Sequence, residues 1–126
     1  MFSITNNIII YILSLLPKSF VKIFSKKYVA GVTINEALDI VKELNNSKNK
    51  VTIDILGEHT QNKLDCSKIV QEYINILEEI NKRKLDCNLS IKPSHIGSDI
   101  NNEFMIDNFK KIQKSASKYN NFLRLD

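Results

Sequence analysis

Short apolar runs and longer amphipathic stretches alternate along most of the chain. The runs at 51–56, 87–92 and 121–126 are short and rich in β-branched or large apolar residues, a pattern typical of strands. Between them, 64–83 and 101–119 repeat apolar residues at helical spacing. The residues expected on the inner faces of these two helices are Ile69, Tyr73, Ile76, Leu77, Ile80, Phe104, Phe109, Ile112 and Ala116.

A further helix is predicted to begin at Thr33. Thr33 and Glu36 have the spacing of a capping box, in which each side chain accepts from the backbone amide of the other residue. The apolar positions that follow at helical spacing are Ile34, Ala37, Leu38, Val41 and Leu44. The polar stretch 45–49 then predicts a turn before the first strand.

The predicted order after this helix is β-α-β-α-β, with successive strands about 35 residues apart, as in right-handed βαβ units of a parallel sheet. The first strand is nearly all apolar, which suits a strand covered on both faces. Doubly wound sheets and (β/α)₈ barrels both use this order. The turn at 57–60 has no glycine-rich phosphate loop, which favours the barrel.

Residues 1–32 form a basic and apolar segment, predicted to be helical. The apolar run at 8–16 is too short to span a membrane. One interpretation is a helix packed against the rest of the protein. The alternative is an interfacial helix on anionic lipid. The basic residues of this segment are Lys18, Lys22, Lys26 and Lys27, and it contains no acidic residue.

Composition is that of one globular domain: 126 residues, 43% hydrophobic and 25% charged. The net charge of +4 arises in residues 1–32, and the only arginines are Arg83 and Arg124. Nucleic-acid binding is therefore not expected, because such modules spread Lys and Arg over one face. The two cysteines cannot form a disulfide scaffold, which favours a reduced, cytoplasmic setting.

Three charged residues, Glu58, Lys92 and Asp126, each fall at the carboxyl end of a successive predicted strand. In a barrel the carboxyl ends of the strands form the edge where active sites are built, so these groups would converge there. The alternative is that strand ends are polar because they meet solvent.

Other reactive residues carry weaker signals. His59 and His95 lie in the expected loops after the first two strands, but no third and fourth ligand is evident, so no metal site is expected. Cys66 begins a helix, where a lowered thiol pKa is one expectation. Cys87 begins a strand and is expected to fill a small apolar space.

Several segments in order resemble the monofunctional bacterial proline dehydrogenases. They are 28–31 (YVAG), the capping-box helix, 51–58 (VTIDILGE), 89–92 (LSIK) with Ile96-Gly97, and 121–126 (NFLRLD). The resemblance is collinear from about residue 14 onward and matches the N-terminal part of the family.

The resemblance implies a (β/α)₈ barrel that holds FAD and oxidises L-proline to 1-pyrroline-5-carboxylate, with electrons passing to a membrane quinone. Lys92 matches a lysine that contacts the substrate carboxylate. Asp126 matches an active-site aspartate beside that lysine. Glu58 matches a glutamate that pairs with an arginine near the eighth strand and helps to close the site. Asp54 also matches a family position, with no chemistry assigned to it.

The sequence differs from the family in length. A (β/α)₈ barrel takes about 250 residues, and three of its eight strands are predicted here, in 33–126 after the segment 1–32. We therefore expect a truncated proline dehydrogenase that is inactive alone, cytoplasmic or peripheral at the inner face of the membrane. Most FAD contacts would lie outside these residues. The alternatives are a non-catalytic module that pairs with a complementing chain, and a membrane-surface protein built on 1–32.

Overall fold

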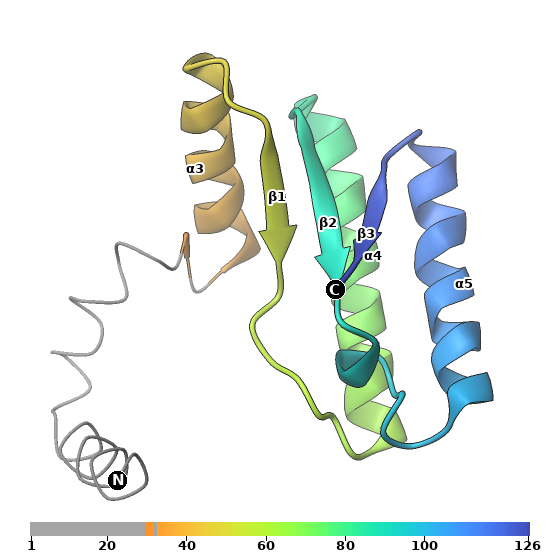
Figure 1. Ribbon diagram of the computed structural model, residues 1–126. Coiled ribbons are helices and arrows are strands. Elements are labelled where there is room, and N and C mark those ends of the chain that lie inside the picture. The colour runs from red at the N-terminus through yellow and green to blue at the C-terminus, as the bar shows by residue number, and fades with distance from the viewer. Residues whose placement is uncertain (1–29, 32) are drawn as a thin grey trace, which may run out of the picture. The chain divides into compact units, whose positions relative to one another are not determined.

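The computed structural model describes residues 30–31 and 33–126 (Figure 1). The predicted N-terminal helices and the apolar run at 8–16 lie outside the described residues. Leu38–Asp126 forms one compact unit, and the preceding unit is Met1–Ala37. The strands and the candidate site lie within the later unit.

Helix α3 spans Ile34–Asn46 and begins with the predicted capping box. The Glu36 amide donates to Thr33 Oγ1 at 3.3 Å, and the Thr33 amide donates to Glu36 Oε2 at 3.1 Å. Leu38 and Val41 are buried, whereas Leu44 is 40% exposed. The inward stripe of this helix therefore ends a turn earlier than the sequence predicts.

The three strands form one parallel sheet in the order β1-β2-β3, with β1 at Val51–Asp54, β2 at Cys87–Ile91 and β3 at Leu123–Leu125 (Figure 1). The predicted β-α-β-α-β order is confirmed. Strand β1 is shorter than predicted, because it ends at Asp54 instead of continuing to Leu56. The predicted position of Glu58 at a strand end is therefore wrong.

Helix α4 (Lys63–Arg83) connects β1 to β2, and α5 (Asn102–Lys118) follows a 3₁₀ turn, η1 (Pro93–His95), and leads to β3. Asparagine caps begin both helices: Asn62 accepts from the Asp65 amide at 2.8 Å and Asn101 from the Phe104 amide at 3.1 Å. Helix α4 packs on β2 and on α5. The buried apolar side chains of α4, α5 and β2 include Val70, Tyr73, Ile76, Leu77, Ile80, Leu89, Ile91, Ile112 and Ala116.

The sheet has two chemically different faces, because side chains alternate along each strand. Residues 87, 89 and 91 of β2 are apolar and buried, and their register partners on β1 and β3 are apolar too. The intervening positions carry polar residues, in the register pairs Thr52–Asn88, Asp54–Ser90 and Ser90–Arg124. Thr52 and Asp54 are exposed, so β1 is not covered on both faces as its apolar run suggested.

Side-chain amides form hydrogen bonds with backbone groups at the amino edge of the sheet. Asn45, near the end of α3, donates to the Asp86 carbonyl at 3.0 Å and accepts from the Asp86 amide at 2.8 Å. Asn121 donates to the Cys87 carbonyl at 2.9 Å. These contacts fix the loops that feed into β2 and β3.

Candidate functional site

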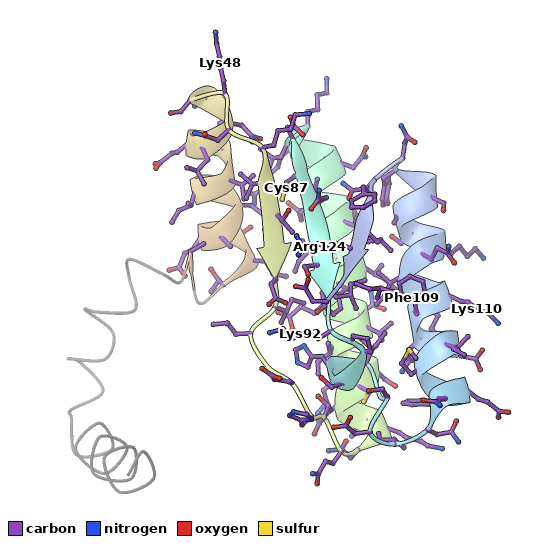
Figure 2. All side chains as sticks on the ribbon, in the orientation of Figure 1. Lys48, Cys87, Lys92, Phe109, Lys110 and Arg124 are labelled. Atoms are coloured by element: carbon purple, nitrogen blue, oxygen red, sulfur yellow. The ribbon has the colours of Figure 1, made fainter. Side chains whose placement is uncertain are left out.

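Polar side chains from all three strands meet at the carboxyl edge of the sheet. Asp54, Ser90 and Arg124 form one register row across β1, β2 and β3. Lys92 and Asp126 lie two residues beyond Ser90 and Arg124, on the same face. Figure 2 shows Lys92 just past the end of β2, with Arg124 on the neighbouring β3. We call these five residues, with Glu58, the carboxyl-edge cluster.

Lys92 is an anchored cation in this cluster. Its Nζ lies 3.1 Å from Asp54 Oδ2 and 3.9 Å from Glu58 Oε1. Its side chain is 26% exposed, so solvent screens these contacts only in part. The hydrogen bond and charge of Asp54 raise the pKa of Lys92 above its ordinary value, with smaller contributions from Glu58 and Asp126. The ammonium form is thus strongly favoured.

Asp126 reaches the same edge but has other direct partners. Ser90 Oγ donates to Asp126 Oδ2 at 2.6 Å, and Arg124 Nε donates to Asp126 Oδ1 at 2.9 Å. The Ser90 hydrogen bond lowers the pKa of Asp126, and the charges of Arg124 and Lys92 act in the same direction. The expected proximity of Asp126 to Lys92 thus takes the form of a charge–charge interaction across the cluster.

Glu58 lies in the loop after β1, four residues beyond the strand. Its side chain is 57% exposed, and its carboxylate is the more distant of the two acidic partners of Lys92. The sequence brings it near the edge, as expected, but from a loop rather than from the strand.

Two contacts join the loop after β1 to the segment after β2, and Gly57 lies close to His95 there. The Thr60 amide donates to the Ser94 carbonyl at 3.1 Å, and His59 Nδ1 lies 2.7 Å from Asp99 Oδ2. Gly57 has φ +138°, and a Cβ there would lie 2.7 Å from His95 Nε2. A side chain at position 57 is therefore disfavoured by both its backbone conformation and the nearby imidazole.

The other candidate residues, His95, Cys66 and Cys87, are buried in the fold. His95 is buried against Tyr73, with ring centroids 6.4 Å apart, and burial lowers its pKa. Burial raises the pKa of Cys66, which is the opposite of the lowering considered from its place at a helix start. Burial also raises the pKa of Cys87 to about 11, and Cys87 fills apolar space as predicted.

Within 30–31 and 33–126, no three His, Cys, Asp or Glu side chains are arranged to hold a metal ion. No helix in the described part of the chain combines the length and apolarity needed to cross a membrane.

Sequence reasoning assigned no chemistry to Asp54 and did not single out Ser90 or Arg124. The two-residue alternation of side chains along a strand is the signal that could identify these residues. Asn88, Ser90 and Lys92 alternate with Leu89 and Ile91, so the even positions share one face. Asp54 and Arg124 join them once the parallel register is known.

A parallel sheet with helical crossovers and charged groups gathered at its carboxyl edge defines an α/β protein, and both doubly wound sheets and (β/α)₈ barrels place their sites at this edge. A crystal structure of proline utilization A (PutA) from Bdellovibrio bacteriovorus, inactivated by N-propargylglycine, matches the structure of this chain with a TM-score of 0.78. The match covers 86% of this chain and 14% of that chain at 20% sequence identity. The fold is thus the first three strands of a (β/α)₈ barrel.

Sequence comparison supports the resemblance to proline dehydrogenases. Proline dehydrogenase 1 of Bacillus subtilis is 30% identical over 102 residues, or 81% of this chain and 34% of the relative. Proline dehydrogenase 2 of the same species is 25% identical over 83% of the chain and 35% of the relative, and the Deinococcus radiodurans proline dehydrogenase is 28% identical over 81% and 34%. No family model matches the chain.

The resemblance to the proline dehydrogenase family is therefore confirmed. The chain spans about a third of the length of the relatives that it matches. By this resemblance it is related to oxidoreductases.

Proposed function

We propose that this chain forms part of an FAD-dependent proline dehydrogenase that oxidises L-proline to 1-pyrroline-5-carboxylate in proline catabolism. The observation that carries the proposal is the carboxyl-edge cluster, where Lys92 is held as a cation among carboxylates at the edge that barrels use for catalysis. The named proline dehydrogenases that resemble most of the chain support the choice of substrate.

In this proposal Lys92 binds the proline carboxylate. An ammonium group has three N–H donors, and Asp54 accepts from one of them at 3.1 Å. The side chain keeps 26% of its surface exposed, so a substrate carboxylate has access to the cation. Binding there would orient the amino acid for reaction and neutralise its charge.

Asp126 is proposed as the catalytic aspartate and Glu58 as the gate residue. Ser90 and Arg124 fix the Asp126 carboxylate, which would lie beside the bound amino acid. Glu58, exposed on its loop, would pair with an arginine supplied by another part of the barrel. The cluster has three carboxylates, Asp54, Glu58 and Asp126, against two cations, Lys92 and Arg124. The substrate carboxylate therefore needs further cations from outside these residues.

The described residues do not fit a complete FAD site. A pyrophosphate needs available cations or backbone amides. In this proposal Lys92 binds the substrate carboxylate, and Arg124 is engaged by Asp126 at 2.9 Å, so neither cation of the cluster is left for a pyrophosphate. We therefore assign FAD binding to other parts of a complete barrel and derive no step through the flavin. For the same reason the 126-residue chain is proposed to be inactive alone.

The electron acceptor is proposed to be a membrane quinone, with the protein cytoplasmic or peripheral at the inner face of the membrane. The support is the family resemblance together with the four lysines of residues 1–32, which lie outside the described residues. The two interpretations of that segment, a packed helix and an interfacial helix, make different predictions. Only the second predicts liposome binding that weakens as salt is added.

A second candidate is an assembly module that pairs with a complementing chain. The favouring observation is β3, which lies at one side of the described sheet and has exposed apolar residues within it and directly before it. Phe122 is 68% exposed and Leu125 is 55% exposed. An unpaired parallel edge of this kind accepts another strand, from the same polypeptide or from a second one.

The deciding experiment isolates the native protein from its source cells with an antibody to residues 101–120. The intact mass, the flavin absorbance and proline-dependent bleaching are then measured. A mass above 14.5 kDa with a flavin that proline bleaches would support the dehydrogenase. A 14.5 kDa chain bound to a second polypeptide, and inactive with proline, would favour the assembly module instead. A flavin-free protein of any mass that proline does not affect would refute the first proposal.

A further inference from the structure

Lys92 and Asp54 are diagonal neighbours across two strands. Asp54 on β1 is in register with Ser90 on β2, and Lys92 lies two residues further along the same face. Diagonal neighbours of this kind are within reach of a long side chain. The pairing thus follows from the strand register, continued one residue past the end of β2.

The three carboxylates of the cluster are unequal partners for Lys92. Asp54 Oδ2 lies 3.1 Å from Nζ, within hydrogen-bond distance, whereas Glu58 Oε1 lies at 3.9 Å. The Asp54 side chain is 33% exposed and that of Glu58 is 57% exposed, so water screens Glu58 more. Asp126 is engaged at 2.6 Å by Ser90 and at 2.9 Å by Arg124.

The direct contacts of the cluster therefore form two separate groups. One joins Lys92 to Asp54 across β1 and β2, and the other joins Asp126 to Ser90 and Arg124 across β2 and β3. We propose that Asp54 is the positioning residue that holds the Lys92 ammonium at the carboxyl edge, and that Asp126 and Glu58 are secondary in this role. The ligand presented to Lys92 rests on the proposed function, but the pairing itself does not.

Positioning by Asp54 has a chemical consequence. A lysine side chain is flexible because it has four rotatable bonds, so the position of its ammonium group varies unless a partner restrains it. Asp54 fixes the position of Nζ and uses one of its three donors, so that the others remain to orient a carboxylate. A carboxylate at this distance also favours the protonated form of the amine.

The test is an NMR titration of the chain labelled with ¹³C and ¹⁵N in its lysines, in which Lys92 is assigned by its loss in Lys92→Met. We expect Asp54→Asn to lower the pKa of Lys92 toward that of an unpaired lysine. Two matched controls, Glu58→Gln and Asp126→Asn, remove the other carboxylates and should lower it less. Backbone amide spectra of β1 and β2 check the fold of each variant.

A merely structural role for Asp54 predicts that the pKa of Lys92 stays unchanged in a folded Asp54→Asn protein, and that result would overturn the inference. An equal or larger fall in Glu58→Gln or Asp126→Asn would also overturn it. If Asp54→Asn does not fold, Asp54→Thr removes the carboxylate with a residue that favours strands, as Thr52 does at the preceding position on that face.

The outcome is separable from that of the proposed function. A native protein without proline oxidation would refute the dehydrogenase proposal and leave the titration result standing. Conversely, an active dehydrogenase in which Asp54→Asn leaves the Lys92 titration unchanged would refute only the positioning role.

Discussion

The two edges of the parallel sheet are built from different chemistry. At the amino edge, neutral amide side chains form hydrogen bonds with the backbone. Asn45 bonds to the backbone amide and carbonyl of Asp86, and Asn121 bonds to the Cys87 carbonyl. At the carboxyl edge, charged side chains bond to one another, as in the Lys92–Asp54 pair. Neutral amides hold loops in place, whereas clustered charges set protonation states and attract ligands. We therefore expect the amide hydrogen bonds of the amino edge to stabilise its loops, and we assign ligand binding to the charged groups of the carboxyl edge.

The largest expected effect is on activity at the carboxyl edge. In the proline-oxidising enzyme that we propose, Lys92→Ala should raise the KM for proline by about tenfold to hundredfold, since a hydrogen bond to a charged group contributes about 1.5–3 kcal/mol. Flavin content should fall less. Steady-state kinetics and flavin absorbance measure both.

The matched control is Asn45→Ala at the opposite edge, which should leave proline kinetics unchanged because Asn45 bonds to the backbone of Asp86 and Asn49, away from the carboxyl-edge cluster. Unaltered kinetics in Lys92→Ala would rule out its role in substrate binding.

Gly57→Ala tests a position at the carboxyl edge where the backbone conformation favours glycine. Its φ of +138° is unfavourable for alanine, and the new Cβ would lie 2.7 Å from the buried His95 ring. We expect a loss of about 2 kcal/mol in the free energy of unfolding, the usual scale of such strain. Urea denaturation measures it. Ser98→Ala, in the loop after β2, is the comparison variant. An equal loss in both would argue against a special role for Gly57.

Asn45→Ala should lower the free energy of unfolding by about 1–2 kcal/mol, because several modest hydrogen bonds are lost together at a partly exposed site. Urea denaturation followed by circular dichroism measures the change. Asn46→Ala, one residue further along α3, is the control and should cost less. If the two variants were equally stable, the amino edge would not depend on the Asn45 side chain.

The amino-acid pattern predicts the sheet better than it predicts the site. Helices α4 and α5 lie within two residues of their predicted bounds, because apolar spacing and asparagine caps are local signals. The Thr33–Glu36 capping box is local too, and it is confirmed.

The cluster depends on register between strands, which no local signal provides. The apolar residues Ile55 and Leu56 extend the predicted first strand past Asp54, and this placed Glu58 at a strand end. Gly57 and His59 both adopt positive φ, and the chain leaves the sheet before them. The contact between Asp54 and Lys92 becomes visible only when β1 is paired with β2.

The smallest expected effect is the pH dependence of the contact between the two loops. Asp99 raises the pKa of His59 through its hydrogen bond and charge, and Glu58 adds to this. A raised pKa in the folded state means that protonated His59 stabilises the fold. This contribution is fully present below the unfolded-state pKa of about 6.5. It is lost as the pH rises through the higher folded-state value.

His59→Gln should remove this pH dependence while leaving the sheet intact. The matched variant Asp99→Asn should instead return the pKa of His59 toward its ordinary value, as followed by the imidazole signals in an NMR titration. Because His59 is 69% exposed, the effect on stability should be small beside that of Asn45→Ala. A His59 pKa that is unchanged in Asp99→Asn would argue against the His59–Asp99 contact and leave the Thr60–Ser94 hydrogen bond to join the loops. The charges of the carboxyl edge would then act on ligands and not on the loops.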